Sequence, residues 1–326
     1  MKKVIVTGGC GFIGSHLCEK LIKLKYQVTI IDNLSTGRLE NISRFKNKVK
    51  FYKLDIKNKY KIDKLFKKID IVYHCAALAD IVPSIQNPQS YYDSNVTGSL
   101  NVVSSCVKNN VKRIIYTASS SCYGINKNTP TSEDEKISPE YPYALTKYLG
   151  EQIILHWSKV YNLKCISLRL FNVYGPRSRT SGTYGAMFGT FLTQKLYHKP
   201  FTVVGNGKQT RDFTYVSDIV DALILASKSS IKIDTFNVGS GATISVNHII
   251  KLLGGKSVKI PKRPGEPDIT FANINKIKRK LKWKPKIKIE KGVKLLLDNI
   301  DYWKKAPVWT PKKIELATKD WFKYLK

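Results

Sequence analysis

The chain has 326 residues, 42% of them hydrophobic, and this length suits one large domain or two closely packed ones. No run of about 18 apolar residues occurs, so no membrane-spanning helix is expected. The formal net charge of +32 comes mainly from lysines spread along the chain, which is typical of a solvated surface and argues against a nucleic-acid partner.

Apolar strands alternate with amphipathic helices through the first half of the chain. The expected strands are Lys3–Thr7, Gln27–Asp32, Val49–Asp55, Ile69–His74, Arg113–Thr117 and Lys164–Leu170. The expected helices are Phe12–Leu24, Asp63–Lys67, Tyr91–Asn109 and Tyr143–Tyr161. This alternation predicts an α/β fold with a doubly wound parallel sheet of the Rossmann type.

After Asn172 the alternation becomes less regular. The elements expected there are the helices Gly189–Leu196 and Ser217–Ser227 and a strand over Thr235–Val238. We therefore predict a Rossmann domain over residues 1–172, to which segments near 210–240 return. A smaller C-terminal α/β domain over residues 173–326 would bind the substrate.

A glycine-rich turn joins the first expected strand to the first expected helix. Gly8, Gly11 and Gly14 are spaced as in dinucleotide-binding turns, where glycines let backbone amides approach a pyrophosphate at a helix N-terminus. Asp32 ends the second expected strand, where a carboxylate accepts hydrogen bonds from ribose hydroxyls and repels a 2′-phosphate. The pattern predicts NAD as the cofactor rather than NADP, although Arg38 in the next loop would favour a phosphate.

Two further patterns predict a general base near the cofactor. Tyr143 and Lys147 form a Tyr-x-x-x-Lys pair, and positions four apart share one face of a helix. A nearby ammonium lowers the pKa of a phenol, so Tyr143 could take a hydroxyl proton while hydride leaves the same carbon. Ser119 follows the fifth expected strand, at the sheet edge where parallel α/β folds bind ligands, and could hydrogen-bond the reacting oxygen.

The six cysteines indicate a reducing compartment. They form no Cys-x-x-Cys pair, and no histidine cluster accompanies them. Disulfides and zinc are therefore not expected, and we predict free thiols, no metal site and a cytoplasmic location.

With these patterns the sequence resembles the extended short-chain dehydrogenase/reductase family, NAD-dependent epimerase/dehydratase type. It is most similar to the nucleotide-sugar 4-epimerases typified by UDP-glucose 4-epimerase. The resemblance covers nearly the whole chain and includes the segments Asp32–Gly37, His74–Ala77, Asn95–Gly98, Leu170–Arg177, Gln209–Phe213 and Arg263–Glu266.

The resemblance implies roles for individual residues. The implied catalytic residues are Ser119, Tyr143 and Lys147. The implied cofactor-binding residues are Gly8, Gly11, Phe12, Ile13, Gly14, Asp32, Asn33, Asp55, Ile56, Ala76, Ala77, Asn95, Tyr143 and Lys147. The implied substrate-binding residues are Ser119, Asn172, Val204, Arg211, Arg263 and Glu266. Two arginines against a diphosphate form a strong charge-assisted arrangement.

Enzymes of this family differ at the two positions after the catalytic serine or threonine. Dehydratases have an acid pair there and decarboxylases a glutamate, whereas this chain has Ser120 and Ser121. The resemblance therefore favours 4-epimerisation through a transient 4-keto sugar. The alternatives are a 4,6-dehydratase, decarboxylase or 4-ketoreductase of the same family and, more remotely, a non-catalytic NAD-binding protein that interacts with RNA.

The resemblance also bears on the substrate and the assembly. We expect a UDP-linked sugar of the glucose/galactose or N-acetylglucosamine type. Val204 stands where family members often stack an aromatic ring on uracil, so the base is indicated less strongly than the diphosphate. A homodimer is implied, formed through the helices Tyr91–Asn109 and Tyr143–Tyr161.

Overall fold

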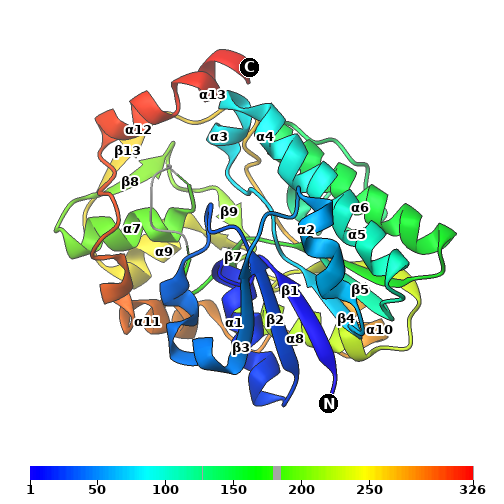
Figure 1. The fold of residues 1–326 in the computed structure, drawn as a ribbon. Helices are drawn as coiled ribbons and strands as arrows, with labels where there is room; N and C mark the ends of the chain where they lie inside the picture. The colour runs from blue at the N-terminus through cyan, green and yellow to red at the C-terminus, as the bar shows by residue number, and fades with distance from the viewer. Residues whose placement is uncertain (127, 179–184, 326) are drawn as a thin grey trace.

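Figure 1 shows the computed structural model of the chain, which describes residues 1–126, 128–178 and 185–325. Within these residues, seven parallel strands form one central sheet in the order β11-β6-β5-β4-β1-β2-β3. Their bounds are β1 Lys3–Thr7, β2 Gln27–Asp32, β3 Val49–Lys53, β4 Ile71–His74, β5 Arg113–Ser119, β6 Lys164–Leu170 and β11 Ile233–Val238. The prediction of an α/β fold with a Rossmann-type parallel sheet is confirmed.

The central strands are apolar on both faces because helices cover both sides of the sheet. Along β1, Val4 and Val6 are buried in one core cluster and Ile5 in another. This is the alternation that a strand with a side-chain period of two requires between two covering layers. All four residues of β4 are likewise buried.

Two pairs of helices form these layers (Figure 1). On one face α1 (Phe12–Lys23) packs against α8 (Val216–Lys228), and on the other α5 (Gly98–Lys108) packs against α6 (Pro142–Val160). The other helical elements of the first half are a 3-10 segment over Leu39–Lys48, α2 Lys59–Asp63, a 3-10 turn over Lys64–Phe66, α3 Ile81–Gln86, α4 Pro88–Tyr92, a π-helical turn over Asp93–Thr97 and a 3-10 turn over Ser120–Tyr123.

The helix expected over Asp63–Lys67 lies earlier in the chain. The α-helix α2 ends at Asp63, and a 3-10 turn follows it. The side chain of Asn58 accepts a hydrogen bond from the amide of Lys61, and this cap starts the helix at Lys59.

The helix expected over Tyr91–Asn109 is built from three pieces. α4 starts at Pro88, where Asn87 caps it by accepting from the amide of Ser90. A π-helical turn then joins α4 to α5. Proline suits the first helical position because its missing N–H would have no helical partner there.

The second half of the chain forms a smaller lobe beside the sheet (Figure 1). Its elements are β7 Val173–Tyr174, α7 Met187–Leu196, β8 Phe201–Val204, β9 Thr210–Arg211, β10 Thr214–Tyr215, β12 Ile244–Ser245, α9 Val246–Leu253, β13 Ser257–Ile260, α11 Ile289–Leu297, a 3-10 turn over Ile300–Trp303, α12 Pro311–Ala317 and α13 Lys319–Tyr324. Phe191, Phe201 and Trp303 lie in its core. Between these elements the chain returns to the sheet as α8 and β11, and α10 (Asn275–Leu281) packs on β11. The predicted domain boundary at residue 172 stays a prediction.

None of the described helices is long and apolar enough to cross a membrane. The six cysteines are free thiols, and five of them are buried. Among the described residues no group of three or more histidine, cysteine or acidic side chains could hold a metal ion.

A buried carboxylate, Asp212, joins three segments that are far apart in the sequence. It accepts hydrogen bonds from the amides of Ser240, Gly241 and Ala272 and from the hydroxyl of Ser240. Burial raises the pKa of Asp212, and these hydrogen bonds oppose that rise. The Asp212 side chain thus fixes the loop after β11 against the chain that leads into α10.

Replacing Asp212 by alanine should destabilise the protein strongly. The buried amide of Ala272 and the partly buried amides of Ser240 and Gly241 would lose their acceptor, and an unsatisfied buried donor costs about 1–3 kcal/mol. We expect the free energy of unfolding in urea to fall by about 3 kcal/mol or more. Asp301→Ala is the control, because the Asp301 side chain is 73% exposed and its loss should change stability by less than about 0.5 kcal/mol. Equal effects of the two substitutions would contradict this role.

Candidate functional site

A cavity of about 650 Å³ lies where the central strands end, between the sheet and the smaller lobe. The glycine turn, the loop after β4, the end of β5, the start of α6 and the loop Arg263–Pro267 contribute to its wall. The predicted site residues that line it are Gly8, Gly11, Phe12, Ile13, Gly14, Asp32, Asn33, Asp55, Ile56, Ala76, Ala77, Ser119, Tyr143, Lys147, Asn172, Val204, Arg211, Arg263 and Glu266.

Asn95 lies behind this wall instead of in it. Its side chain is fully buried, accepts from the amide of Leu78 at 2.9 Å and donates to the carbonyl of Leu78 at 3.0 Å. It also donates to the hydroxyl of Thr146 at 3.1 Å. Asn95 therefore holds the loop after β4 against α6, because an amide group can satisfy a backbone donor and acceptor together.

The glycine turn forms one end of the cavity. Gly8 has a φ of +70°, and a Cβ atom there would lie 2.7 Å from the backbone nitrogen of Ala76. A Cβ atom at Gly14 would collide with the carbonyl oxygen of Gly8. In the described structure no side chain caps the start of α1 and no acidic residue lies in its first turn. This end thus offers free amides and the positive end of a helix dipole, which fits the pyrophosphate of NAD.

Asp32 lines the same end of the cavity, and two hydrogen bonds fix the orientation of its carboxylate. Its two carboxylate oxygens accept from the amides of Cys10 at 2.9 Å and Leu34 at 2.8 Å. Burial raises the pKa of Asp32, and both hydrogen bonds lower it. Next to it, the side-chain amide of Asn33 donates to the carboxylate of Asp55 at 3.0 Å. An oriented carboxylate at the end of β2 fits the ribose hydroxyls of NAD.

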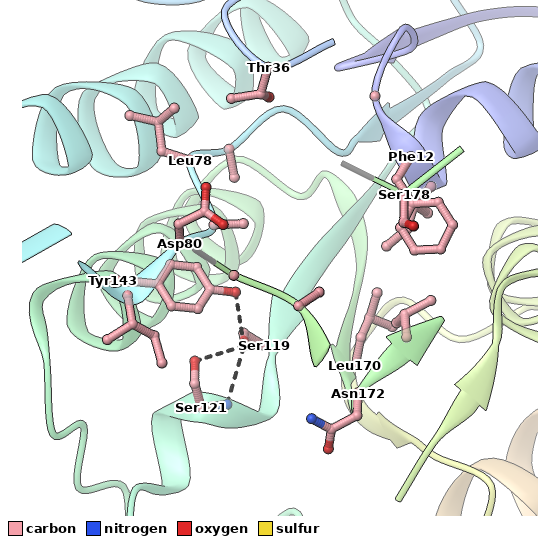
Figure 2. A pocket seen from close by; sticks show the side chains of 18 of the residues that line it. Phe12, Thr36, Leu78, Asp80, Ser119, Ser121, Tyr143, Leu170, Asn172 and Ser178 are labelled. Atoms are coloured by element: carbon pink, nitrogen blue, oxygen red, sulfur yellow. Dashed lines mark hydrogen bonds between the residues drawn. The ribbon is translucent and has the colours of Figure 1, made fainter. Parts of the chain in front are cut away.

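Tyr143 and Ser119 meet in the middle of the cavity (Figure 2). The Tyr143 hydroxyl donates to the Ser119 hydroxyl oxygen at 3.3 Å. The same oxygen accepts from the amide of Ser121 at 3.2 Å and lies 2.7 Å from the Ser121 hydroxyl. Because β5 ends at Ser119 and α6 begins at Pro142, rigid elements position both hydroxyls.

Lys147 lies one helical turn behind Tyr143. Its ammonium donates to the carbonyl of Thr117 at 2.7 Å and lies 4.2 Å from the centre of the Tyr116 ring. Burial lowers the pKa of Lys147 to about 8, so this side chain still carries most of its charge at neutral pH.

The pKa of Tyr143 differs from the sequence-based expectation. Burial raises the pKa of the Tyr143 phenol, the negative charge of Asp80 raises it further, and the hydrogen bond with Ser119 opposes the rise. The expected lowering by Lys147 does not dominate, because the phenol is desolvated and the Lys147 ammonium is directed to a backbone carbonyl.

Two arginines line another part of the wall, in the smaller lobe. Arg211 lies 3.0 Å and Arg263 lies 3.7 Å from the carboxylate of Glu266. Arg211 also donates to the carbonyl of Thr210 at 2.9 Å. The two guanidinium groups thus converge on one carboxylate, and such an arrangement suits a diphosphate. Val204 lines the same cavity and packs against a small apolar cluster with Ile260 and Ile314.

The structure adds three residues that the sequence did not indicate. Asp80, Tyr141 and Trp321 all line the cavity. Figure 2 shows the Asp80 carboxylate beside Tyr143. Asp80 could have been found, because it is the acidic residue of the loop that follows a central strand. Trp321 could not, since it lies almost 180 residues after Tyr143 and only the tertiary fold brings the two together.

Residues 4–239 match the model of the NAD dependent epimerase/dehydratase family. The chain belongs to this family. A UDP-glucose 4-epimerase of Lactobacillus helveticus is 34% identical over 307 residues, covering 87% of this chain and 92% of that protein.

Two solved structures from the family are similar over nearly their whole length. A UDP-glucose 4-epimerase of Thermotoga maritima with UDP-glucose has a TM-score of 0.86 at 34% identity, covering 93% of this chain and 99% of that one. A UDP-glucuronic acid 4-epimerase of Bacillus cereus with UDP-glucuronic acid and NAD has a TM-score of 0.85 at 32% identity, covering 92% and 99%. The family and the fit of the glycine turn confirm NAD as the cofactor.

Substitution of Asp32 by alanine should weaken NAD binding. Hydrogen bonds to a charged group contribute about 1.5–3 kcal/mol, so the Kd for NAD should rise about 10- to 100-fold. Removing the charge should also reduce the discrimination against NADP. Fluorescence titration of cofactor-stripped protein with each dinucleotide measures both effects. A variant that binds NAD as tightly as the wild type would exclude Asp32 from cofactor recognition.

Proposed function

We propose that the chain is a 4-epimerase that acts on a UDP-hexose and keeps NAD bound through its cycle. The observation that carries the proposal is the 3.3 Å contact of the Tyr143 and Ser119 hydroxyls in a cavity that a glycine turn and two arginines also line. A sugar bound through its diphosphate at the arginines would present its ring to this pair. The UDP-sugar complexes of the family support this assignment.

In the proposed mechanism Tyr143 takes the proton from the 4-hydroxyl of the sugar and later returns it. Ser119 hydrogen-bonds the same oxygen, and Lys147 favours the phenolate form of Tyr143 through its positive charge. The glycine turn and Asp32 would hold NAD, whose nicotinamide would supply the acceptor for the C4 hydride and its later return to the sugar. Arg211 and Arg263 would hold the diphosphate while the sugar turns over, so that positioning supplies much of the rate.

A 4,6-dehydratase of the same family is the second candidate. Ser120 and Ser121 argue against it, because neither hydroxyl acts readily as an acid or base at neutral pH. Asp80 argues for it, because it brings a carboxylate next to Tyr143.

Product analysis in deuterium oxide separates the two candidates. The purified protein is incubated without added cofactor with UDP-glucose, UDP-N-acetylglucosamine and UDP-glucuronate, and the products are examined by mass spectrometry and NMR. Epimerisation predicts an unchanged mass and no deuterium on sugar carbon. Loss of water, of carbon dioxide or release of reduced or oxidised cofactor would each exclude it.

The Tyr143→Phe substitution removes the proposed base and keeps the ring. We expect turnover to fall more than about 100-fold with little change in NAD content, because general base catalysis contributes on this scale. Tyr161→Phe, at the exposed end of the same helix, is the matched control and should keep its activity. Near-normal turnover of the Tyr143→Phe variant would rule out its role.

Lys147→Met should shift the pH dependence of kcat/KM. An ammonium beside a phenol lowers the pKa of the phenol, so its removal raises that pKa and moves the rising limb of the profile to higher pH, by about one unit or more. Lys159→Met, an exposed site on the same helix, should leave the limb in place. An unshifted limb in the Lys147→Met variant would show that the lysine does not tune Tyr143.

We also propose that the enzyme is a cytoplasmic homodimer. The free, mostly buried thiols support a reducing compartment. The helices α5 and α6, which pack against each other, are the expected dimer surface.

A further inference from the structure

The C-terminal helix α13 lies against the arginine loop of the cavity. Its Trp321 is 3% exposed and lines the cavity wall. The indole N–H donates to the carbonyl of Pro264 at 2.7 Å, and the guanidinium carbon of Arg263 lies 5.2 Å from the centre of the indole ring. One side chain thus contacts both the backbone and the charged group of the segment that carries Arg263 and Glu266.

The same helix is attached to the sheet-bearing part of the molecule. α13 packs on α3, which follows the loop after β4, and Figure 1 shows the two helices side by side. The side-chain amide of Gln86, the last residue of α3, donates to the carboxylate of Asp320 at 2.9 Å. The packing of α13 on α3 thus ties Trp321 to the part of the molecule that carries Tyr143. Trp321 itself contacts the loop that carries Arg263.

An aromatic row continues from Trp321 to the proposed base. The Tyr141 ring lies 6.5 Å from the Trp321 ring and is stacked on the Tyr143 ring at 6.3 Å with an interplanar angle of 8°. Tyr141 directly precedes α6. The row links the two functional ends of the cavity through packed side chains.

We propose that Trp321 is a positioning residue, which orients Arg263 toward the diphosphate of the substrate. A guanidinium group can stack its face on an aromatic ring while its edge donates hydrogen bonds to an anion. Here the guanidinium carbon of Arg263 lies over the indole ring, and Nη1 of Arg263 lies 3.7 Å from the carboxylate of Glu266. The Arg263 side chain is 11% exposed, so it is already withdrawn from water before an anion binds.

This inference rests on the proposed function only in taking a diphosphate as the anion. Its test therefore measures binding as well as turnover, with UDP, inorganic pyrophosphate and uridine as probes of the NAD-loaded protein. Failure to interconvert any UDP-sugar, with UDP still bound, would remove the proposed function and leave the role of Trp321 testable.

Two substitutions separate the ring from the N–H group. Trp321→Leu removes both the aromatic face and the donor, and we expect the Kd for UDP and for pyrophosphate to rise about tenfold or more. The Kd for uridine should stay the same. Trp321→Phe keeps an aromatic face and should stay within about threefold of the wild type. For the sugar nucleotide, Trp321→Leu should raise KM about tenfold and keep kcat within about threefold.

Two controls exclude a merely structural effect. Phe322→Ala alters the neighbouring exposed residue of α13 and should leave every constant unchanged. In an Arg263→Ala background, Trp321→Leu should add almost nothing to the Kd for UDP, because Trp321 acts through Arg263. Unchanged UDP binding in Trp321→Leu, or full additivity with Arg263→Ala, would overturn the proposal. If the Trp321→Leu variant does not fold, the Trp321→Phe variant provides the test. An equal rise in its Kd for uridine and its Kd for UDP would overturn the proposal.

Discussion

The parallel register of β1, β4 and β5 sets the position of the groups at the sheet side of the cavity. Thr7 is paired with His74, and His74 with Tyr116, so the three strands reach the same edge of the sheet. The chain can then place the glycine turn, the loop after β4 and Ser119 side by side. The contact between Gly8 and Ala76 shows how closely the first two approach, since a Cβ atom would not fit between them. Parallel α/β sheets bind ligands at this edge for the same reason.

Burial and charge oppose each other at the reactive centre. Desolvation raises the pKa of Tyr143 and lowers that of Lys147, so each group is shifted toward its neutral form. A base that works at neutral pH needs positive charge close to the phenol, and Lys147 follows Tyr143 by about one turn of α6. At the arginine end of the cavity, the carboxylate of Glu266 offsets part of the positive charge of Arg211 and Arg263. The remaining positive charge would attract a bound diphosphate.

Local patterns predicted much of this arrangement. The bounds of β1, β2 and β6 agree with the sequence, because apolar runs or alternations between glycine or polar turns are easy to recognise. Local patterns also indicated the glycine turn, Asp32, Ser119 and the Tyr143–Lys147 pair, which lie at strand ends or near the start of a helix, whereas the resemblance to the family supplied the other site residues. Asn95 was assigned to the cofactor, but it braces the loop after β4, and its partners Leu78 and Thr146 are identifiable only in three dimensions.

Two features depend on tertiary structure alone. The sequence indicates a lysine near Tyr143, but the pKa of the phenol depends on how deeply the fold buries it. Trp321 reaches Arg263 only because α13 packs on α3. Neither depth of burial nor helix docking leaves a periodic signal along the chain.

A crystal structure of the protein with NAD and UDP bound tests the central claim most directly. We expect the dinucleotide pyrophosphate over Gly8–Gly14 and the UDP diphosphate between the guanidinium groups of Arg211 and Arg263. The hydroxyls of Tyr143 and Ser119 would face the space between the nicotinamide and the UDP. A dinucleotide bound elsewhere, or a Tyr143 side chain turned away from that space, would contradict it.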